Sequence, residues 1–129
     1  MQAIIIIIKK VKERKMEKDL HELKGETLII HLPEELDHHT VGEVRNATDD
    51  LFIGKRVRNV IFDYEKTSFM DSSGIGLIMG RYREVRYLKG NVYLVNIGKK
   101  MERILEISGL YRVAIRAEDI STAMEMIKE

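Results

Sequence analysis

The chain has no cysteine, no tryptophan and a single proline among its 129 residues. Without thiols, neither a disulfide nor a cysteine nucleophile can form, and a zinc site would need histidine and carboxylate ligands alone. The lack of cysteine fits a reducing compartment, where disulfides are rare. We therefore expect a cytoplasmic protein that folds without covalent or metal crosslinks.

Long apolar runs are also missing. The five isoleucines at residues 4–8 fall far short of the about 20 residues that a transmembrane helix needs. A secretory signal would place its basic residues before such a run, whereas here they follow it. With 44% hydrophobic and 33% charged residues, the composition is that of one globular domain, and we expect no membrane partner.

The chain carries almost no net charge, at +1, but this value hides an asymmetry. Residues 1–15 have five basic side chains and one acidic side chain, so the remainder has a net charge of −3. A mildly acidic folded part lacks the basic footprint of a nucleic-acid-binding protein, and no nucleic-acid partner is expected. We interpret residues 1–15 as an N-terminal extension and residues 16–129 as the domain. The extension is open to three interpretations: an added strand, a disordered tail, or a misassigned start with Met16 as the true one.

The first half of the domain predicts a hairpin, a helix and a strand. Residues 18–33 have the pattern of two short strands around a turn at Gly25. After the polar segment "EELDHHT", Thr40 is a candidate helix cap with Glu43 as its capping-box partner, and Gly54 is the expected helix end. The segment "VRNVIFDY" is apolar enough in its centre to be a strand buried on both faces.

The second half alternates helices with strands. Residues 73–88 predict a helix, and its expected apolar stripe consists of Ile75, Ile78, Met79, Tyr82 and Val85. The segments "NVYLVN" and "YRVAI" predict strands, and "KKMERILEISG" and residues 118–128 predict helices. Together these patterns predict an α/β fold: an initial hairpin, then alternating strands and helices, with a mixed, mostly parallel sheet covered by helices.

The sequence has two candidate enzyme-like sites: the serines of the motif "FMDSSGIGLIMGRY" and the histidine pair at residues 38–39. A serine nucleophile elbow needs glycine two residues before and two residues after the serine, and neither Ser72 nor Ser73 meets this condition. The adjacent His38 and His39 point in opposite directions on an extended loop, so we expect no metal site there. Hydrolase and metalloenzyme functions are therefore disfavoured.

The glycines of the same motif leave one alternative function open. Gly74, Gly76 and Gly80 follow a strand and open a helix, as in a dinucleotide-binding turn. Their spacing is one residue too long, and the next strand ends in Asn96 rather than in the expected acidic residue. A nucleotide-binding domain that uses this turn remains the alternative hypothesis.

The segment Asp71, Ser72 and Ser73 stands at the predicted start of a helix. An aspartate or serine oxygen there caps free backbone N–H groups and stabilises the helix by about 1 kcal/mol. A phosphate on a serine at the same place would be stabilised by the positive end of the helix dipole. From the residues alone, a structural cap and a phosphorylation switch are about equally well supported.

Three motifs in order carry a resemblance to a known family: "ELDHHT" at residues 35–40, "FMDSSGIGLIMGRY" at residues 69–82 and "MERILEISGLYR" at residues 101–112. Together they resemble the STAS-domain anti-sigma-factor antagonists, and in particular the sporulation antagonists of the anti-sigma F factor. The resemblance implies a STAS-like fold and a small cytoplasmic binding protein without cofactor or catalytic activity. Apart from the resemblance, we expect a monomer.

The resemblance also implies partners and site residues. An anti-sigma factor that is also a serine kinase would bind the unmodified protein, release its sigma factor, and phosphorylate Ser72; a serine phosphatase would reverse this. Phosphorylation would switch the antagonist off. The implied partner-binding residues are Asp37, His38, Asp71, Ser73, Gly74, Ile75 and Gly76.

Overall fold

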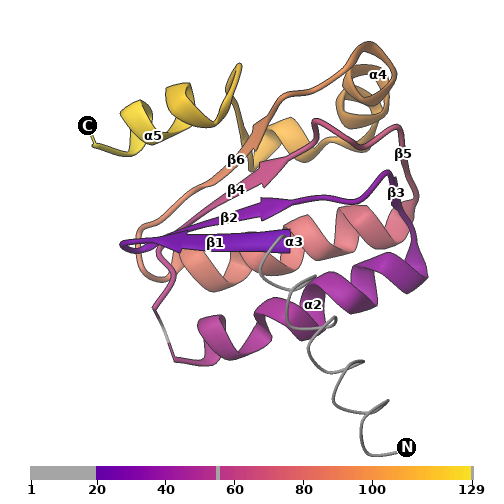
Figure 1. Ribbon diagram of the computed structural model, residues 1–129. Helices are drawn as coiled ribbons and strands as arrows, with labels where there is room; N and C mark the ends of the chain where they lie inside the picture. The colour runs from indigo at the N-terminus through magenta and orange to yellow at the C-terminus, as the bar shows by residue number, and fades with distance from the viewer. Residues whose placement is uncertain (1–19, 55, 129) are drawn as a thin grey trace, which may run out of the picture.

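The computed structural model describes residues 20–54 and 56–128. The predicted N-terminal extension, residues 1–15, lies outside the described residues, so the boundary at residue 16 stays a prediction. Within the described part, a five-stranded sheet has the order β1-β2-β4-β6-β7 (Figure 1). The strands are β1 (His21–Lys24), β2 (Thr27–His31), β4 (Asn59–Asp63), β6 (Val92–Val95) and β7 (Ile115–Arg116).

The predicted hairpin is confirmed. Strands β1 and β2 pair antiparallel, with Lys24 opposite Thr27. Gly25 in the turn between them has φ +61°, a conformation that glycine adopts without steric cost. The remaining neighbours, β2 with β4, β4 with β6 and β6 with β7, all pair in parallel. The sheet is therefore mixed and mostly parallel, as the sequence predicts.

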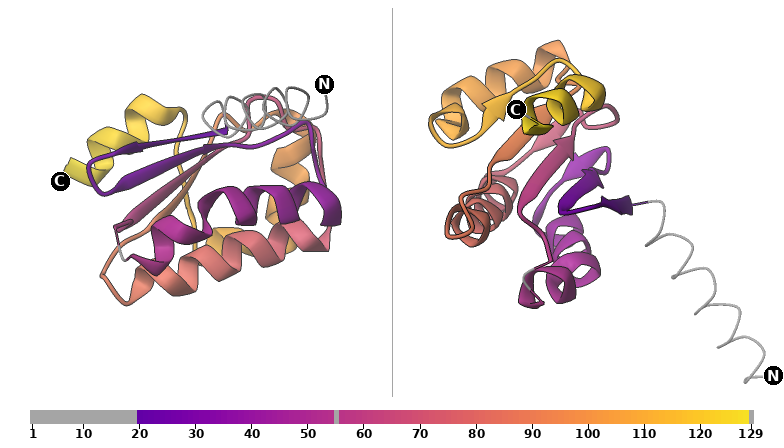
Figure 2. Two further views of the ribbon diagram at one scale, coloured as in Figure 1. Left: turned by 60° about the horizontal axis from the view of Figure 1, so that its bottom comes forward. Right: turned by 90° about the vertical axis from the view of Figure 1, so that its left-hand side faces the viewer.

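Helices cover both faces of this sheet. Helices α2 (His38–Ile53) and α3 (Ser72–Arg86) lie side by side on one face, and α5 (Ile120–Lys128) lies on the opposite face (Figure 2). Helix α4 (Lys99–Ser108) ends at Gly109, as predicted, in the left-handed conformation. None of the helices in the described ranges is long and apolar enough to cross a membrane.

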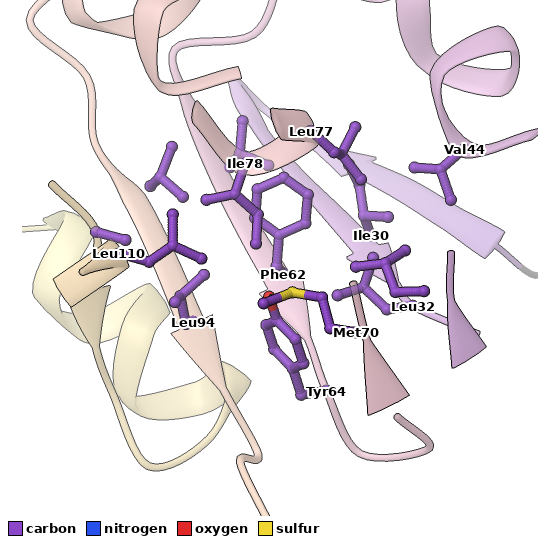
Figure 3. Packing of buried hydrophobic residues seen from close by; sticks show 14 of the residues in the cluster. Ile30, Leu32, Val44, Phe62, Tyr64, Met70, Leu77, Ile78, Leu94 and Leu110 are labelled. Atoms are coloured by element: carbon purple, nitrogen blue, oxygen red, sulfur yellow. The ribbon is translucent and has the colours of Figure 1, made fainter. Parts of the chain in front are cut away.

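The core is built from strand side chains that alternate between the two faces. Ile30, Phe62 and Leu94 are adjacent in register and point toward α2 and α3 (Figure 3). Ile61 and its neighbours belong to a smaller cluster with Ala123 of α5. All these side chains are buried, so the prediction that the strand after Val57 is buried on both faces is confirmed.

All five residues of the predicted apolar stripe of α3 lie in or against the core, but the most buried face of the helix lies to one side of that stripe. The residues buried on this helix are Gly74, Leu77, Ile78, Arg81 and Val85, whereas Ile75, Met79 and Tyr82 are only partly buried. Helix α3 packs against α2 as well as against the sheet, which rotates its buried face toward Leu77 and Arg81.

Three further segments differ from the sequence-based expectation. Residues 110–112, Leu110–Arg112, form a short 3-10 helix, so that the strand expected over "YRVAI" is limited to β7. Two segments for which no strand was predicted contain two-residue strands, β3 (Glu35–Leu36) and β5 (Phe69–Met70). These two strands pair in parallel as a separate small sheet.

Candidate functional site

The small β3–β5 sheet brings two distant helix starts together. Its register places Leu36 opposite Met70, and both side chains are buried. The residue that follows each strand is an aspartate: Asp37 precedes α2 and Asp71 precedes α3. The backbone N–H of Asp71 also donates to the carbonyl oxygen of Leu36 at 3.2 Å. The two helices therefore begin next to each other, at the same edge of the molecule.

Asp37, and not Thr40, caps helix α2. Its carboxylate accepts from the backbone N–H of Thr40 at 3.0 Å, and the Thr40 hydroxyl accepts from the backbone N–H of Asp37 at 2.9 Å. The predicted pair of Thr40 and Glu43 is wrong because the capping box lies three residues earlier. Glu43 contacts His39 instead, at 3.1 Å. The hydrogen bond from the Thr40 N–H lowers the pKa of Asp37.

His38 and His39 occupy the first turn of α2 rather than a loop, and both are exposed. Across residues 20–54 and 56–128 no three histidine, aspartate or glutamate side chains gather as they would around a metal ion. His38 is thus a surface residue directly beside the Asp37 cap, on the edge that carries Asp71.

Asp71 caps helix α3. Its carboxylate accepts a hydrogen bond from the backbone N–H of Ser73 at 2.8 Å, so Ser72 is the first helical residue. The Ser72 side chain is exposed, whereas Ser73 is half-buried. Within the described part of the chain, no hydrogen bond involves the Ser72 hydroxyl. The cap and the accessible hydroxyl therefore belong to different residues, a distinction that the sequence left open.

The glycines of this helix serve different purposes. A Cβ on Gly74 would overlap the Met70 side chain and lie 3.0 Å from Leu36, so the first turn of α3 rests directly on the β3–β5 sheet. Gly74 is buried and shapes the surface from beneath. Gly76 is exposed, and a Cβ on Gly80 would meet nothing within 4 Å. Close packing therefore accounts for Gly74, which weakens the nucleotide-turn interpretation.

A buried carboxylate, that of Asp63, lies at the end of the main sheet where β2 and β4 finish. Asp63, the last residue of β4, lies 2.7 Å from His31 at the end of β2. Burial alone would raise the pKa of Asp63, but hydrogen bonds from Asn96, the Glu65 backbone and His31 outweigh burial and lower it. This pair has no signal in the sequence, because only the parallel register of β2 and β4 places His31 opposite Asp63.

Arg81 ties the two helices together along their length. Its side chain is 5% exposed, and its guanidinium lies over the Phe52 ring of α2 at 4.1 Å from the centroid. It donates to the Thr48 hydroxyl and to the Asp49 carboxylate, both at 2.8 Å. Arg81 lies outside the apolar stripe predicted for this helix, so its burial was not predicted. Arg81 holds α2 against α3 and so helps to fix the relative position of their starts.

The whole arrangement matches one family. Residues 18–123 match the STAS domain, and the chain belongs to the STAS domain family. Among its relatives, the anti-sigma F factor antagonist of Lysinibacillus sphaericus is 40% identical over 85 residues, which are 66% of this chain and 73% of that protein. The anti-sigma F factor antagonist of Paenibacillus polymyxa is 34% identical over 86 residues, covering 67% and 74% of the two chains.

Solved structures agree with this assignment. The unphosphorylated form of the anti-sigma factor antagonist SpoIIAA matches with a TM-score of 0.68 and 30% identity, covering 84% of this chain and 96% of that chain. The phosphorylated form of the Bacillus cell fate determinant SpoIIAA matches with a TM-score of 0.66 and 34% identity, covering 83% and 96%. The predicted STAS-like fold and the family resemblance are confirmed. Nothing in these comparisons supports the nucleotide-binding alternative.

Proposed function

We propose that this protein is an anti-sigma factor antagonist that is switched by phosphorylation of Ser72. In its unmodified form it binds an anti-sigma factor and so frees a sigma factor. The observation that carries the proposal is the exposed Ser72 hydroxyl at the start of α3, in a chain whose helix is already capped by Asp71. Relatives named anti-sigma F factor antagonists favour the sporulation branch and a site of action in the cytoplasm.

The binding surface in this proposal is the edge where α2 and α3 begin. It comprises Asp37 and His38 of the first helix start, and Asp71, Ser73, Gly74, Ile75 and Gly76 around Ser72. Ile75 is half-buried and Gly76 exposed, so the first turn of α3 offers apolar surface and bare backbone. Such a surface suits close packing against a partner protein, because interface cores are depleted of charged residues.

Phosphorylation acts on this surface through charge. It adds about −1.5 to −2 charges at Ser72, beside the carboxylate of Asp71. Desolvating a charge without a matching partner group costs several kcal/mol. A penalty of about 3–4 kcal/mol weakens a complex by two to three orders of magnitude. Because Asp71 already holds the helix start, the charge takes effect without refolding of the domain.

The proposal includes two enzymes that act on the protein. The anti-sigma factor itself is the serine kinase that modifies Ser72, and a serine phosphatase restores the free hydroxyl. The exposed position of Ser72 supports both steps, since each enzyme must reach the side-chain oxygen. We assign no catalytic activity and no cofactor to the antagonist, which we propose acts as a monomer.

A binding experiment tests the proposal. The unmodified protein, a version with phosphoserine installed at position 72 by genetic encoding, and Ser72→Ala are each titrated into the anti-sigma factor of the native host in complex with its sigma factor. We expect the unmodified protein and Ser72→Ala to bind and displace the sigma factor, and the phosphoserine form to bind at least 100-fold more weakly. Equal binding by the phosphoserine form, or no binding by any form, would contradict the proposal.

A further inference from the structure

Arg45 of helix α2 reaches across to the first turn of helix α3. Its Nη2 atom lies 3.7 Å from the position that a Cβ on Gly76 would occupy, and no other atom outside the helix lies within 4 Å of that position. The Arg45 side chain is exposed. Within the described ranges, its guanidinium has no hydrogen bond and no ion pair. A cation without an electrostatic partner therefore lies against the exposed face of the α3 start.

That face is the one that carries Ser72. Residues four apart on a helix lie on the same side, with Cβ atoms about 5–6 Å apart, and Ser72 and Gly76 are four apart in α3. Gly76 has no side chain, so the Arg45 guanidinium approaches the backbone of this turn directly. A phosphoryl group on Ser72 would therefore lie on the same face of α3 as the exposed Arg45 side chain.

A hydrogen bond from α3 fixes the position of the Arg45 backbone relative to that helix. Its carbonyl oxygen accepts from Nη2 of the buried Arg81 at 3.4 Å, and Arg81 also bonds Thr48 one turn further along α2. The Arg45 side chain is exposed and without a bonded partner in the described residues, while its attachment point is fixed relative to the α3 helix. This combination suits a residue that changes partners when a nearby charge appears.

We propose that Arg45 is the intramolecular partner of the phosphate on Ser72. The inference rests on the proposed function, since it concerns the modified form of the same site. Planar guanidinium groups bind phosphate oxygens through paired charge-assisted hydrogen bonds. In the phosphorylated protein, Arg45 folds over the first turn of α3 and covers the bare backbone at Gly76. Phosphorylation thus both adds charge to the binding surface and covers part of it.

The phosphoserine form allows a test that needs no kinase and no partner protein. Phosphoserine is encoded at position 72 in the otherwise unmodified chain, in Arg45→Gln and in Arg83→Gln, and each protein is titrated by ³¹P NMR. Arg83 is the matched control, because it is an exposed arginine in the last turn of α3, the helix that begins at Ser72. At a rise of 1.5 Å per residue, it lies about 16 Å from Ser72 along the helix axis. Circular dichroism checks that all three proteins are folded.

A pairing cation lowers the second pKa of the phosphate, which is about 6 when unperturbed. For an exposed pair we expect this pKa to rise by about 0.3–0.7 unit in Arg45→Gln and to stay unchanged in Arg83→Gln. Arg45→Lys, which keeps the charge but loses the planar fork, should fall between the two. Equal pKa values in the unsubstituted chain and in Arg45→Gln would overturn the inference.

The same variants separate this inference from the proposed function. If the phosphoserine form fails to weaken binding to the anti-sigma factor, the proposed function fails, whatever the NMR titration shows. If phosphoserine weakens binding but Arg45→Gln leaves the phosphate pKa unchanged, only the role of Arg45 fails. An Arg45→Gln substitution that instead weakens binding of the unmodified protein, with no change in phosphate pKa, would assign Arg45 to the partner interface and overturn the proposal.

Discussion

The carboxylate of Asp71 accepts a hydrogen bond from the backbone N–H of Ser73 at 2.8 Å, across the exposed Ser72 that lies between them. Asp71 and Ser72 therefore have separate roles. Asp71 supplies the helix cap, so the Ser72 hydroxyl is not needed for stability. Because the Ser72 hydroxyl makes no stabilising contact in the described part of the chain, Ser72 can gain and lose a phosphate while the domain stays folded.

Removal of the cap and removal of the hydroxyl should therefore have different effects on stability. Asp71→Ala deletes the only side-chain cap recorded for α3 in the described residues and should lower the free energy of unfolding by about 1 kcal/mol. Ser72→Ala should change it by less than about 0.5 kcal/mol, as is usual for exposed positions. Urea denaturation of both variants measures this difference. A larger loss in Ser72→Ala than in Asp71→Ala would show that the cap is misassigned.

Two glycines of α3 offer an internally controlled test of the packing beneath the site. A Cβ at position 74 would overlap Met70, so Gly74→Ala should destabilise the protein by about 1–3 kcal/mol, as overpacking does. A Cβ at position 80 would meet nothing within 4 Å. Gly80→Ala should accordingly stabilise the protein by up to about 1 kcal/mol, through helix propensity.

Both alanine variants can be compared by denaturant midpoint at equal m-value. Gly74→Ala should also weaken binding to the anti-sigma factor, because the displaced first turn carries Ser72 and Ile75. Gly80→Ala should leave binding unchanged. If Gly74→Ala and Gly80→Ala both raised, or both lowered, the free energy of unfolding, the close contact of α3 with the β3–β5 sheet would be contradicted.

Arg81 should be the most sensitive polar residue of the helix pair. Arg81→Ala removes the contact with Phe52 and the bonds to Thr48 and Asp49, and should cost about 2–4 kcal/mol. Arg81→Met retains much of the volume over the ring and should cost about half as much. Thermal and urea unfolding of the two variants test this ranking; equal losses would show that charge pairing, and not packing over Phe52, dominates.

Asp63 makes stability depend on pH in a defined direction. Its pKa is lowered in the folded protein, whereas an unfolded aspartate has a pKa of about 3.9. The stabilisation is therefore fully present well above pH 4 and is lost as pH falls through the folded pKa. We expect the free energy of unfolding to fall more steeply between pH 5 and pH 3 in the wild type than in Asp63→Asn.

The comparison uses urea denaturation at pH 5, 4 and 3. The pKa values of Asp37 and Asp119 are also lowered, and they contribute acid sensitivity of the same sign to both proteins. The difference between the two slopes therefore isolates Asp63. Parallel slopes would mean that Asp63 is not stabilised as a carboxylate by Asn96, Glu65 and His31.

Long periodic segments explain why the sequence predicted most of the architecture. The alternation of apolar strands with amphipathic helices requires a layered α/β fold, and Gly25, Gly54 and Gly109 lie at the predicted turn and helix ends. The apolar periodicity of residues 73–88 also placed the segment Asp71, Ser72 and Ser73 at the start of a helix. These features are local, because each depends on residues close together in the chain.

The missed features depend on residues far apart in the chain. Strands of two residues, such as β3 and β5, have no periodicity, and their pairing exists only in the folded protein. The sequence predicts a cap by Thr40 with Glu43, whereas the structure has a cap by Asp37 with Thr40. The Thr40 hydroxyl also donates to the carbonyl oxygen of Glu35 in β3 at 2.7 Å, a contact that the capping pattern does not include. The burial of Arg81 was not predicted, because the groups that it contacts on α2, among them Phe52 and Asp49, come next to it only when the two helices pack.

The most direct test of the central claim is to map the phosphate. The protein is incubated with ATP and the anti-sigma factor of the native host, and the wild type and Ser72→Ala are then analysed by mass spectrometry of their peptides. We predict one phosphate, on Ser72, in the wild type and none in Ser72→Ala, together with loss of the complex on phosphorylation. Phosphate on Ser73 or elsewhere, or none in a wild-type protein that binds the anti-sigma factor, would contradict the account of Ser72 as the switch.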